Sequence, residues 1–220
     1  MRTILNKQVD GTNGRKANKS KIPQFFYKMN IQGVHMNFSK IIKKISMLGV
    51  VVFSTILIGA CSVSLDANKY EQIDPKFDIE RFFDGKVKAW GIVQDRDGDI
   101  VQRFIVHIDG YKKDGNLILD ERFEYGFGDG PKTRVWTLSK NADGSYTGNA
   151  GDIAGPAKGT PHGNAFNFAY EMDLAVGDST YRVNFDDWFF AFDDKTMMNR
   201  SYIKKFGIVM AEVSIFMQKQ

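Results

Sequence analysis

Two charged side chains, Glu121 and Arg134, fall on otherwise apolar faces of neighbouring predicted strands. Alternation along residues 117–125 places Glu121 among apolar side chains, and along residues 133–139 it places Arg134 beside Trp136. A hairpin between these strands brings the two charges together inside the fold. Such a pair is a structural ion pair, an anchor for the carboxylate or phosphate head group of a ligand, or, for Glu121, a catalytic acid or base.

Asp187 repeats this pattern in a later strand. Along residues 180–192 it shares a face with aromatic and aliphatic side chains, whereas Trp188 lies on the other face. A buried carboxylate needs partners, and Arg200 in the next predicted strand is our candidate. The network either fixes the fold or binds a ligand. In the second case the ligand-binding residues are Glu121, Arg134, Trp136, Asp187 and Arg200.

Other site chemistry has little support in the sequence. Neither His107 nor His162 has a second His or Cys at metal-ligand spacing, so we expect no metal site. The chain contains no Gly-X-Ser-X-Gly nucleophile motif, and its glycine-rich stretches do not follow a phosphate-binding pattern. We therefore assign no catalytic residue and expect no cofactor.

Cys61 is the one cysteine of the chain, and it ends the segment Leu57-Ile58-Gly59-Ala60-Cys61. A basic stretch and an apolar run of about sixteen residues precede it, which is the length of a signal peptide core rather than a membrane span. An aliphatic residue, two small residues and a cysteine match the lipobox of bacterial lipoproteins. This match implies cleavage after Ala60 and acylation of Cys61, whose acyl chains hold the protein on a membrane.

These signals predict four parts of the chain. Residues 1–35 are polar and without periodicity, and we interpret them as an upstream extension that precedes a true start at Met36. Residues 36–60 are the lipoprotein signal peptide, residues 61–74 a polar tether, and residues 75–220 the exported domain.

Charge is unevenly divided between these parts. Residues 1–60 hold ten Lys or Arg and one Asp, which leaves 20 Lys or Arg against 25 Asp or Glu in the rest. The exported domain is therefore mildly acidic, which argues against nucleic-acid binding. Ser62 stands where similar Gram-negative lipoproteins carry an Asp that retains them in the inner membrane. We expect the periplasmic face of the outer membrane instead.

The exported domain shows period-two alternation in short runs separated by Gly, Asp and Asn clusters, a pattern typical of an antiparallel meander. We expect an all-β fold of eight or nine strands that closes into an up-and-down barrel, with a β-sandwich as the competitor. Residues 77–83 are expected to form a short helix or a plug at one end, and the Gly/Pro-rich residues 155–163 a loop. The predicted runs are 86–94, 100–108, 117–125, 133–139, 146–153, 164–176, 180–192, 197–204 and 208–218.

Several segments resemble an uncharacterised proteobacterial lipoprotein family, domain of unknown function 3833. The resemblance spans residues 70–219, and Trp90 to Gly98, Arg134-Val135-Trp136 and Asp186-Asp187-Trp188 are among the segments that carry it. It implies a lipocalin-like, or calycin, barrel and a lipoprotein signal, with no assigned activity.

Three functions are compatible with these observations. The first is an envelope lipoprotein whose barrel binds an apolar ligand, a fatty acid or lipid, and this is the interpretation we favour. The second is an enzyme that modifies a lipid as an isomerase or hydrolase, with Glu121 or Asp187 as acid or base. The third is a structural envelope lipoprotein whose filled barrel contacts only protein partners.

Overall fold

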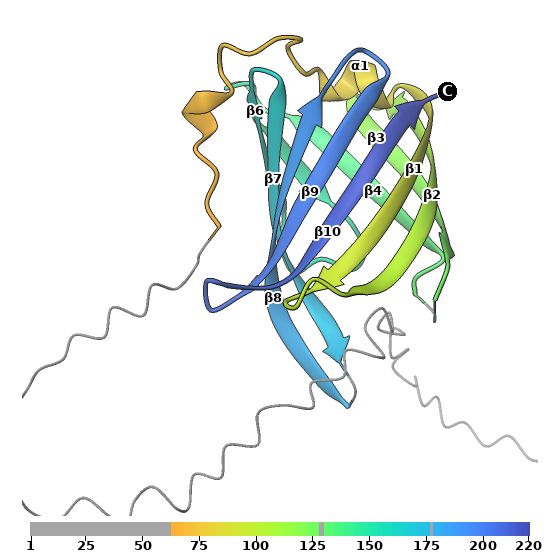
Figure 1. Ribbon diagram of the computed structural model, residues 1–220. Coiled ribbons are helices and arrows are strands. Elements are labelled where there is room, and N and C mark those ends of the chain that lie inside the picture. The colour runs from red at the N-terminus through yellow and green to blue at the C-terminus, as the bar shows by residue number, and fades with distance from the viewer. Residues whose placement is uncertain (1–62, 128–129, 177) are drawn as a thin grey trace, which may run out of the picture.

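The computed structural model describes residues 63–127, 130–176 and 178–220, and these form a closed antiparallel barrel (Figure 1). Each strand pairs with its neighbours in sequence, and β1 pairs with β10 to close the sheet. The strands are β1 (Gly85–Asp95), β2 (Ile100–Lys113), β3 (Asn116–Tyr125), β4 (Thr133–Lys140), β5 (Tyr146–Asn149), β6 (Ala157–His162), β7 (Ala165–Val176), β8 (Ser179–Ala191), β9 (Thr196–Lys205) and β10 (Ile208–Lys219).

The prediction of an all-β, antiparallel up-and-down barrel is confirmed, with ten strands in the described residues rather than eight or nine. The additional strand is β6, which lies in the segment expected to be a loop. It pairs with both β5 and β7, and its inward positions are Ala157 and Gly159. The run predicted over residues 146–153 is shorter than expected, because β5 ends at Asn149.

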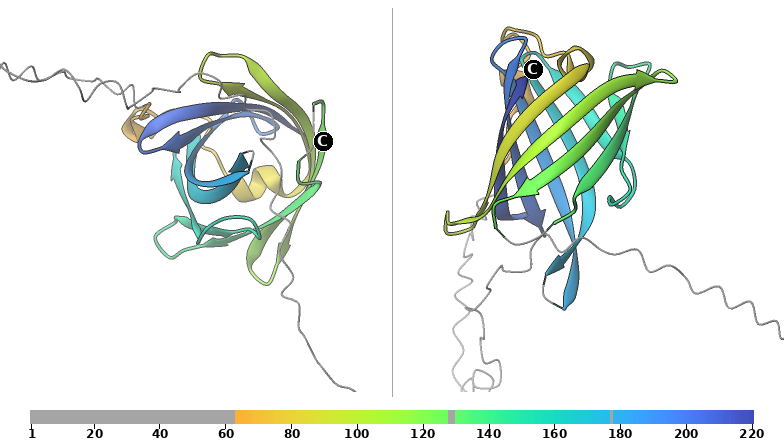
Figure 2. Two further views of the ribbon diagram at one scale, coloured as in Figure 1. Left: turned by 90° about the horizontal axis from the view of Figure 1, so that it is seen from below. Right: turned by 90° about the vertical axis from the view of Figure 1, so that its right-hand side faces the viewer.

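A short helix, α1 (Ile79–Phe83), covers one end of the barrel, as predicted for residues 77–83. The Asp78 carboxylate accepts a hydrogen bond from the Arg81 backbone amide at 3.0 Å and caps the helix. The helix then buries Ile79 and Phe83 against the barrel interior. Figure 2 shows α1 at the far end when the barrel is viewed along its axis.

The core fills the α1 end of the barrel more completely than the opposite end. On β3, Leu117 and Leu119 near α1 are buried, whereas the inward Phe123 and Tyr125 at the other end of the strand are only half-buried. Solvent therefore reaches the interior from the end opposite α1.

The segment before α1 packs against the outer wall of the barrel. A 3-10 helix, η2 (Ala67–Lys69), leads into Tyr70, whose ring lies 5.8 Å from Trp188 and 5.3 Å from Phe190. Leu65 also packs on this cluster. We call residues 65–70 the strap. The tether expected over residues 61–74 is thus partly docked and not free along its length. In the described part of the chain, no helix is long and apolar enough to cross a membrane.

Candidate functional site

A cavity of about 160 Å³ lies inside the barrel beneath α1. Ile79 and Phe83 of α1 close it at one end, and Pro131 in the β3–β4 loop lies at its other end. Most of its wall is aliphatic and aromatic, as expected for a small-molecule site. A cavity needs about 10–15 Å³ for one water, so this one holds a group on the order of ten to fifteen non-hydrogen atoms.

Glu121 and Arg134 face each other across the β3–β4 hairpin, as predicted, and both line the cavity. Among the described residues, however, the ion pair of Arg134 is with Asp152 and not with Glu121. The guanidinium of Arg134 lies 6.0 Å from the centre of the Phe123 ring and 5.9 Å from that of Trp136. These rings restrict where the guanidinium can lie.

The main partner of Arg134 is Asp152, which the sequence pattern did not predict to lie in the site. Arg134 donates to the Oδ2 atom of Asp152 from Nε at 3.1 Å and from Nη2 at 2.7 Å. The other carboxylate oxygen of Asp152, Oδ1, is buried and has no hydrogen-bond partner among the described residues. Asp152 follows the end of β5, where alternation no longer indicates which way a side chain points. Only the need of a buried arginine for an acid could have suggested it.

Trp136 lines the cavity wall as predicted. Its indole meets the rings of Phe168 at 5.1 Å and Tyr170 at 5.3 Å, both edge to face. This cluster comes from β4 and β7, on opposite sides of β5 and β6 in the strand order. Large rings fit there because Gly148 of β5 and Gly159 of β6 leave room for the Phe168 and Phe166 rings.

Asp187 is buried and lines the cavity, but the prediction that Arg200 is its partner is wrong. The hydroxyl of Ser201 donates to its Oδ1 atom. Arg200 points away from the cavity, because β8 pairs Asp187 with Ser201 and Trp188 with Arg200. Neighbouring positions on a strand face opposite sides of the sheet.

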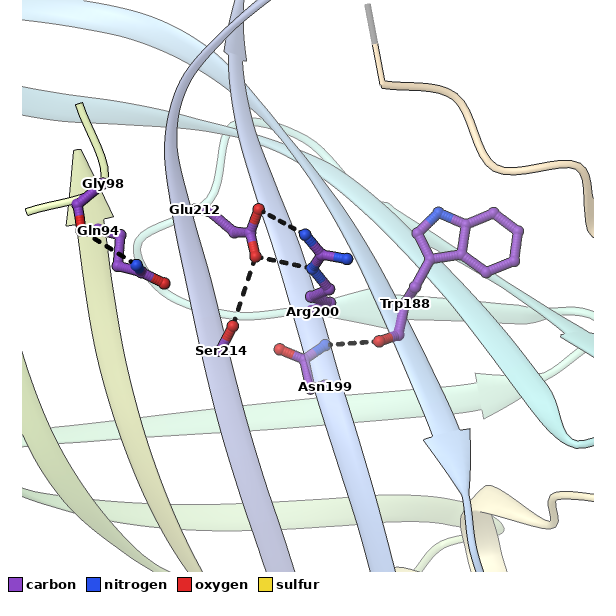
Figure 3. Close-up of polar contacts among 7 residues, drawn as sticks. All are labelled: Gln94, Gly98, Trp188, Asn199, Arg200, Glu212 and Ser214. Atoms are coloured by element: carbon purple, nitrogen blue, oxygen red, sulfur yellow. Dashed lines mark hydrogen bonds and ion pairs between the residues drawn. The ribbon is translucent and has the colours of Figure 1, made fainter. Parts of the chain in front are cut away.

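Arg200 belongs to an ion pair on the outside of the barrel (Figure 3). It donates to Glu212 from Nε at 2.7 Å and from Nη2 at 2.9 Å, and Ser214 lies beside the same carboxylate. Its neighbour Asn199 is buried instead, with its amide 3.5 Å from the carbonyl oxygen of Trp188. Arg200 is therefore not part of the candidate site.

Burial controls the protonation of the interior acids. Loss of solvent raises the pKa of Glu121 to about 7, although Arg134 opposes the shift. Burial likewise raises the pKa of Asp187 to about 7, against the hydrogen bond from Ser201 and the charge of Arg134. The pKa of the Tyr170 hydroxyl rises well above its ordinary value, chiefly through burial. Near neutral pH, Glu121 and Asp187 thus exchange protons readily.

Both histidines of the described residues lie outside the cavity. His107 is exposed and contacts Glu124 at 3.2 Å, while His162 stacks on Trp188 at 5.9 Å and contacts Glu71 at 2.7 Å. Among the described residues, no group of three or more His, Cys, Asp or Glu could hold a metal ion. The lipobox and Cys61 precede the described residues.

The site is suited to two roles, ligand binding and proton transfer. It can bind an apolar molecule whose polar end lies near the cluster of Arg134, Asp152 and Glu121. It can also transfer protons, because carboxyl groups with a pKa near 7 are suited to general acid or base catalysis.

Comparisons with known proteins identify a family and a distant structural likeness. The model of a family described as "Protein of unknown function (DUF3833)" matches residues 55–219. A search of curated proteins finds no match. Among solved structures, the chain is similar to an S-type phycobiliprotein lyase, CPES, from Guillardia theta. The TM-score is 0.47 at 11% identity, over 69% of this chain and 98% of that chain. A likeness at this level says nothing about ligand or activity.

Proposed function

The chain belongs to the DUF3833 family of proteins of unknown function, and we propose that its barrel binds an apolar small molecule with an acyl or alkyl chain, such as a lipid. The observation that carries this proposal is the cavity beneath α1, whose apolar wall surrounds one polar cluster. The apolar chain of such a molecule fits against the apolar wall, and its polar end lies beside Glu121 and Asp152.

The size of the cavity limits the part of a ligand that it encloses. A space for on the order of ten to fifteen non-hydrogen atoms matches a medium-length acyl chain or the end of a longer one. Removing such a chain from water contributes about 0.8 kcal/mol per CH₂ group, so a ten-carbon chain suffices for useful affinity.

The same proposal places the barrel on a membrane through acylated Cys61, at the periplasmic face of the outer membrane. Its support is the order of basic, apolar and small residues before Cys61. The docked strap begins only a few residues after Cys61, so the barrel stays close to the bilayer. An apolar ligand then travels a short distance through water between membrane and cavity.

A second candidate is an enzyme that acts on a bound lipid. The observation in its favour is that two cavity carboxyls, Glu121 and Asp187, have a pKa of about 7. Such groups can remove a proton from a substrate carbon or oxygen and return it, as in an isomerisation. Chemical alteration of a bound lipid that stops in Glu121→Gln or Asp187→Asn would support this candidate.

Binding is tested by titrating the barrel, residues 63–220, with N-phenyl-1-naphthylamine, an uncharged fluorophore that brightens in apolar surroundings. This part of the chain contains all ten strands and both hydrophobic clusters. We expect saturable binding at one site per barrel. Ile215→Trp, which fills the cavity from β10, should abolish it.

The matched control is Phe216→Trp, at the next position of β10. Phe216 is exposed and packs against Trp90 on the outer wall, so a tryptophan there leaves the cavity unchanged. Equal binding by the two variants would mean that the probe binds outside the cavity, and the proposal would fail.

A further inference from the structure

The interior of the barrel contains more acid than base. Of the described residues that line the cavity, Arg134 is the one base, whereas Glu121, Asp152 and Asp187 bring carboxyl groups to it. Asp173 also lies at the edge of the cavity, but its side chain is half exposed and forms an ion pair with Arg182.

The single base is already neutralised. Both Nε and Nη2 of Arg134 donate to the same oxygen of Asp152, and the two side chains are about four-fifths buried. Glu121, on the neighbouring strand β3, lies directly across from Arg134 and is a second acid close to it. An incoming carboxylate or phosphate would therefore meet no free positive charge and would have to be desolvated beside existing acids.

At the polar end of the cavity, the buried atom that lacks a hydrogen-bond partner among the described residues is an acceptor. The Oδ1 atom of Asp152 is buried without a partner among the described residues, although a carboxylate oxygen can accept two hydrogen bonds. Glu121 lines the same space. A buried acceptor that lacks a partner costs about 1–3 kcal/mol, and a ligand that donates to it recovers this cost.

We infer that the ligand carries a hydrogen-bond donor without negative charge at its polar end, such as a hydroxyl or an ammonium group, and that ionised fatty acids are poor ligands. This inference rests on the proposed binding function and narrows the class of ligand. The donor contacts Asp152 Oδ1 and Glu121, while Arg134 holds Asp152 in place and does not itself bind the head group.

Three ten-carbon compounds that differ only in their polar end test the inference: 1-decanol, decylamine and decanoate. Each is titrated against the barrel, residues 63–220, loaded with N-phenyl-1-naphthylamine at about pH 8. We expect decanol and decylamine to displace the probe at concentrations about tenfold or more below that needed for decanoate, because a buried unpaired carboxylate is strongly disfavoured.

Asp152→Asn is the variant that should change this order. It preserves the shape of the side chain but leaves Arg134 without its carboxylate. We expect decanoate to bind about tenfold more tightly than to the unaltered barrel, and decylamine about tenfold more weakly. Glu212→Gln is the matched control, because it removes a carboxylate that accepts from Nε and Nη2 of an arginine, Arg200, but outside the barrel. It should leave the order unchanged.

Glu121→Gln tests the inference without disturbing the Arg134–Asp152 pair. It can therefore be used even if Asp152→Asn does not fold. It should weaken decylamine severalfold and leave decanol nearly unchanged, because it removes one negative charge near the polar end.

The outcomes separate this inference from the proposed function. Absence of probe binding, or displacement that is the same in Ile215→Trp, overturns both. Displacement from the cavity in which decanoate equals or exceeds decanol and decylamine overturns only the class of ligand inferred here. Unchanged affinities for decylamine and decanoate in Asp152→Asn, together with an unchanged affinity for decylamine in Glu121→Gln, overturn the role of these two acids.

Discussion

Arg134 has three carboxyl groups around it inside the barrel and its charge can balance only one of them. Asp152 takes that place through two hydrogen bonds from the guanidinium. Glu121 and Asp187 are left to the low-dielectric interior, where burial favours their protonated forms. The protonation of two residues therefore sets the charge of the cavity near neutral pH.

Stability should fall as the pH rises toward and through 7. The pKa of Glu121 is about 7 in the folded chain and near its ordinary value of 4.5 in the unfolded chain. Between these values the folded state retains a proton that the unfolded state has lost, so raising the pH favours unfolding. Asp187 acts in the same direction.

Glu121→Gln should remove one of these two contributions. We expect the variant to be more stable than the unaltered barrel at about pH 8, by about 2–3 kcal/mol, and to differ little at about pH 4. Chemical unfolding at both pH values measures this. Glu212→Gln, in the exposed pair with Arg200, should have an effect below about 1 kcal/mol at either pH. A stability difference for Glu121→Gln that does not grow with pH would contradict a buried, protonated Glu121.

At this scale, strand alternation predicted some of the site and missed the rest. It placed Glu121, Arg134, Trp136 and Asp187 in the interior, because each lies within a long strand whose faces are clear. It did not determine which residue of β9 faces Asp187, since that depends on the register between strands. A shift of one residue exchanges Ser201 for Arg200.

The helix α1 determines which end of the cavity is closed. It approaches the barrel wall at Gly110 of β2, where an added Cβ would overlap the backbone carbonyl oxygen of Phe83. The absence of a side chain at Gly110 thus allows the last residue of α1 to sit directly on the sheet. Phe83 then lies almost completely buried over the cavity.

Gly110→Ala should push α1 away from the barrel. We expect a loss of about 1–3 kcal/mol in the free energy of unfolding, because the contact is with backbone that cannot rotate aside. Amide exchange within residues 79–83 should accelerate. The matched control is Gly151→Ala, where an added Cβ has open space around it and should change the stability little. If Gly110→Ala and Gly151→Ala changed the free energy of unfolding by similar amounts, the close contact at Gly110 would not determine the position of α1.

Elements with long, alternating apolar runs were predictable from the sequence, and β6 was not. Its inward positions, Ala157 and Gly159, are small, and Pro161 lies within it, so its hydrophobic alternation is weak. Tertiary context makes it a strand: β5 and β7 pair with it on both sides, and the Phe166 ring occupies the space above Gly159. Similarly, Asp152 lies beyond the end of β5, where no alternation applies.

For the molecule as a whole, the strap links the predicted membrane anchor to the barrel wall. Leu65 and Tyr70 pack on the cluster around Trp188 and Tyr202, which belongs to the outer face of β8 and β9. Under the proposed acylation of Cys61, a few residues before this docked segment, the anchor would restrain the distance of the barrel from the bilayer.

Replacement of Cys61 by Ala should transfer the protein from the membrane fraction to the soluble fraction of the cell envelope, because no acyl chain is then attached. Fractionation followed by immunoblotting measures this. Ser62→Asp, which leaves Cys61 intact, should keep the protein on membranes but retain it in the inner membrane. Membrane association that persists unchanged in Cys61→Ala would contradict anchoring through this residue.

The most direct test of the central claim is mass spectrometry of organic extracts from the barrel purified without detergent. Our account predicts about one equivalent of a small amphiphile per chain, with a hydroxyl or amino group rather than an acid at its polar end. The same molecule should be absent from Ile215→Trp and present in Phe216→Trp. Extracts that contain no small molecule, or that are the same for both variants, would contradict ligand binding in the cavity.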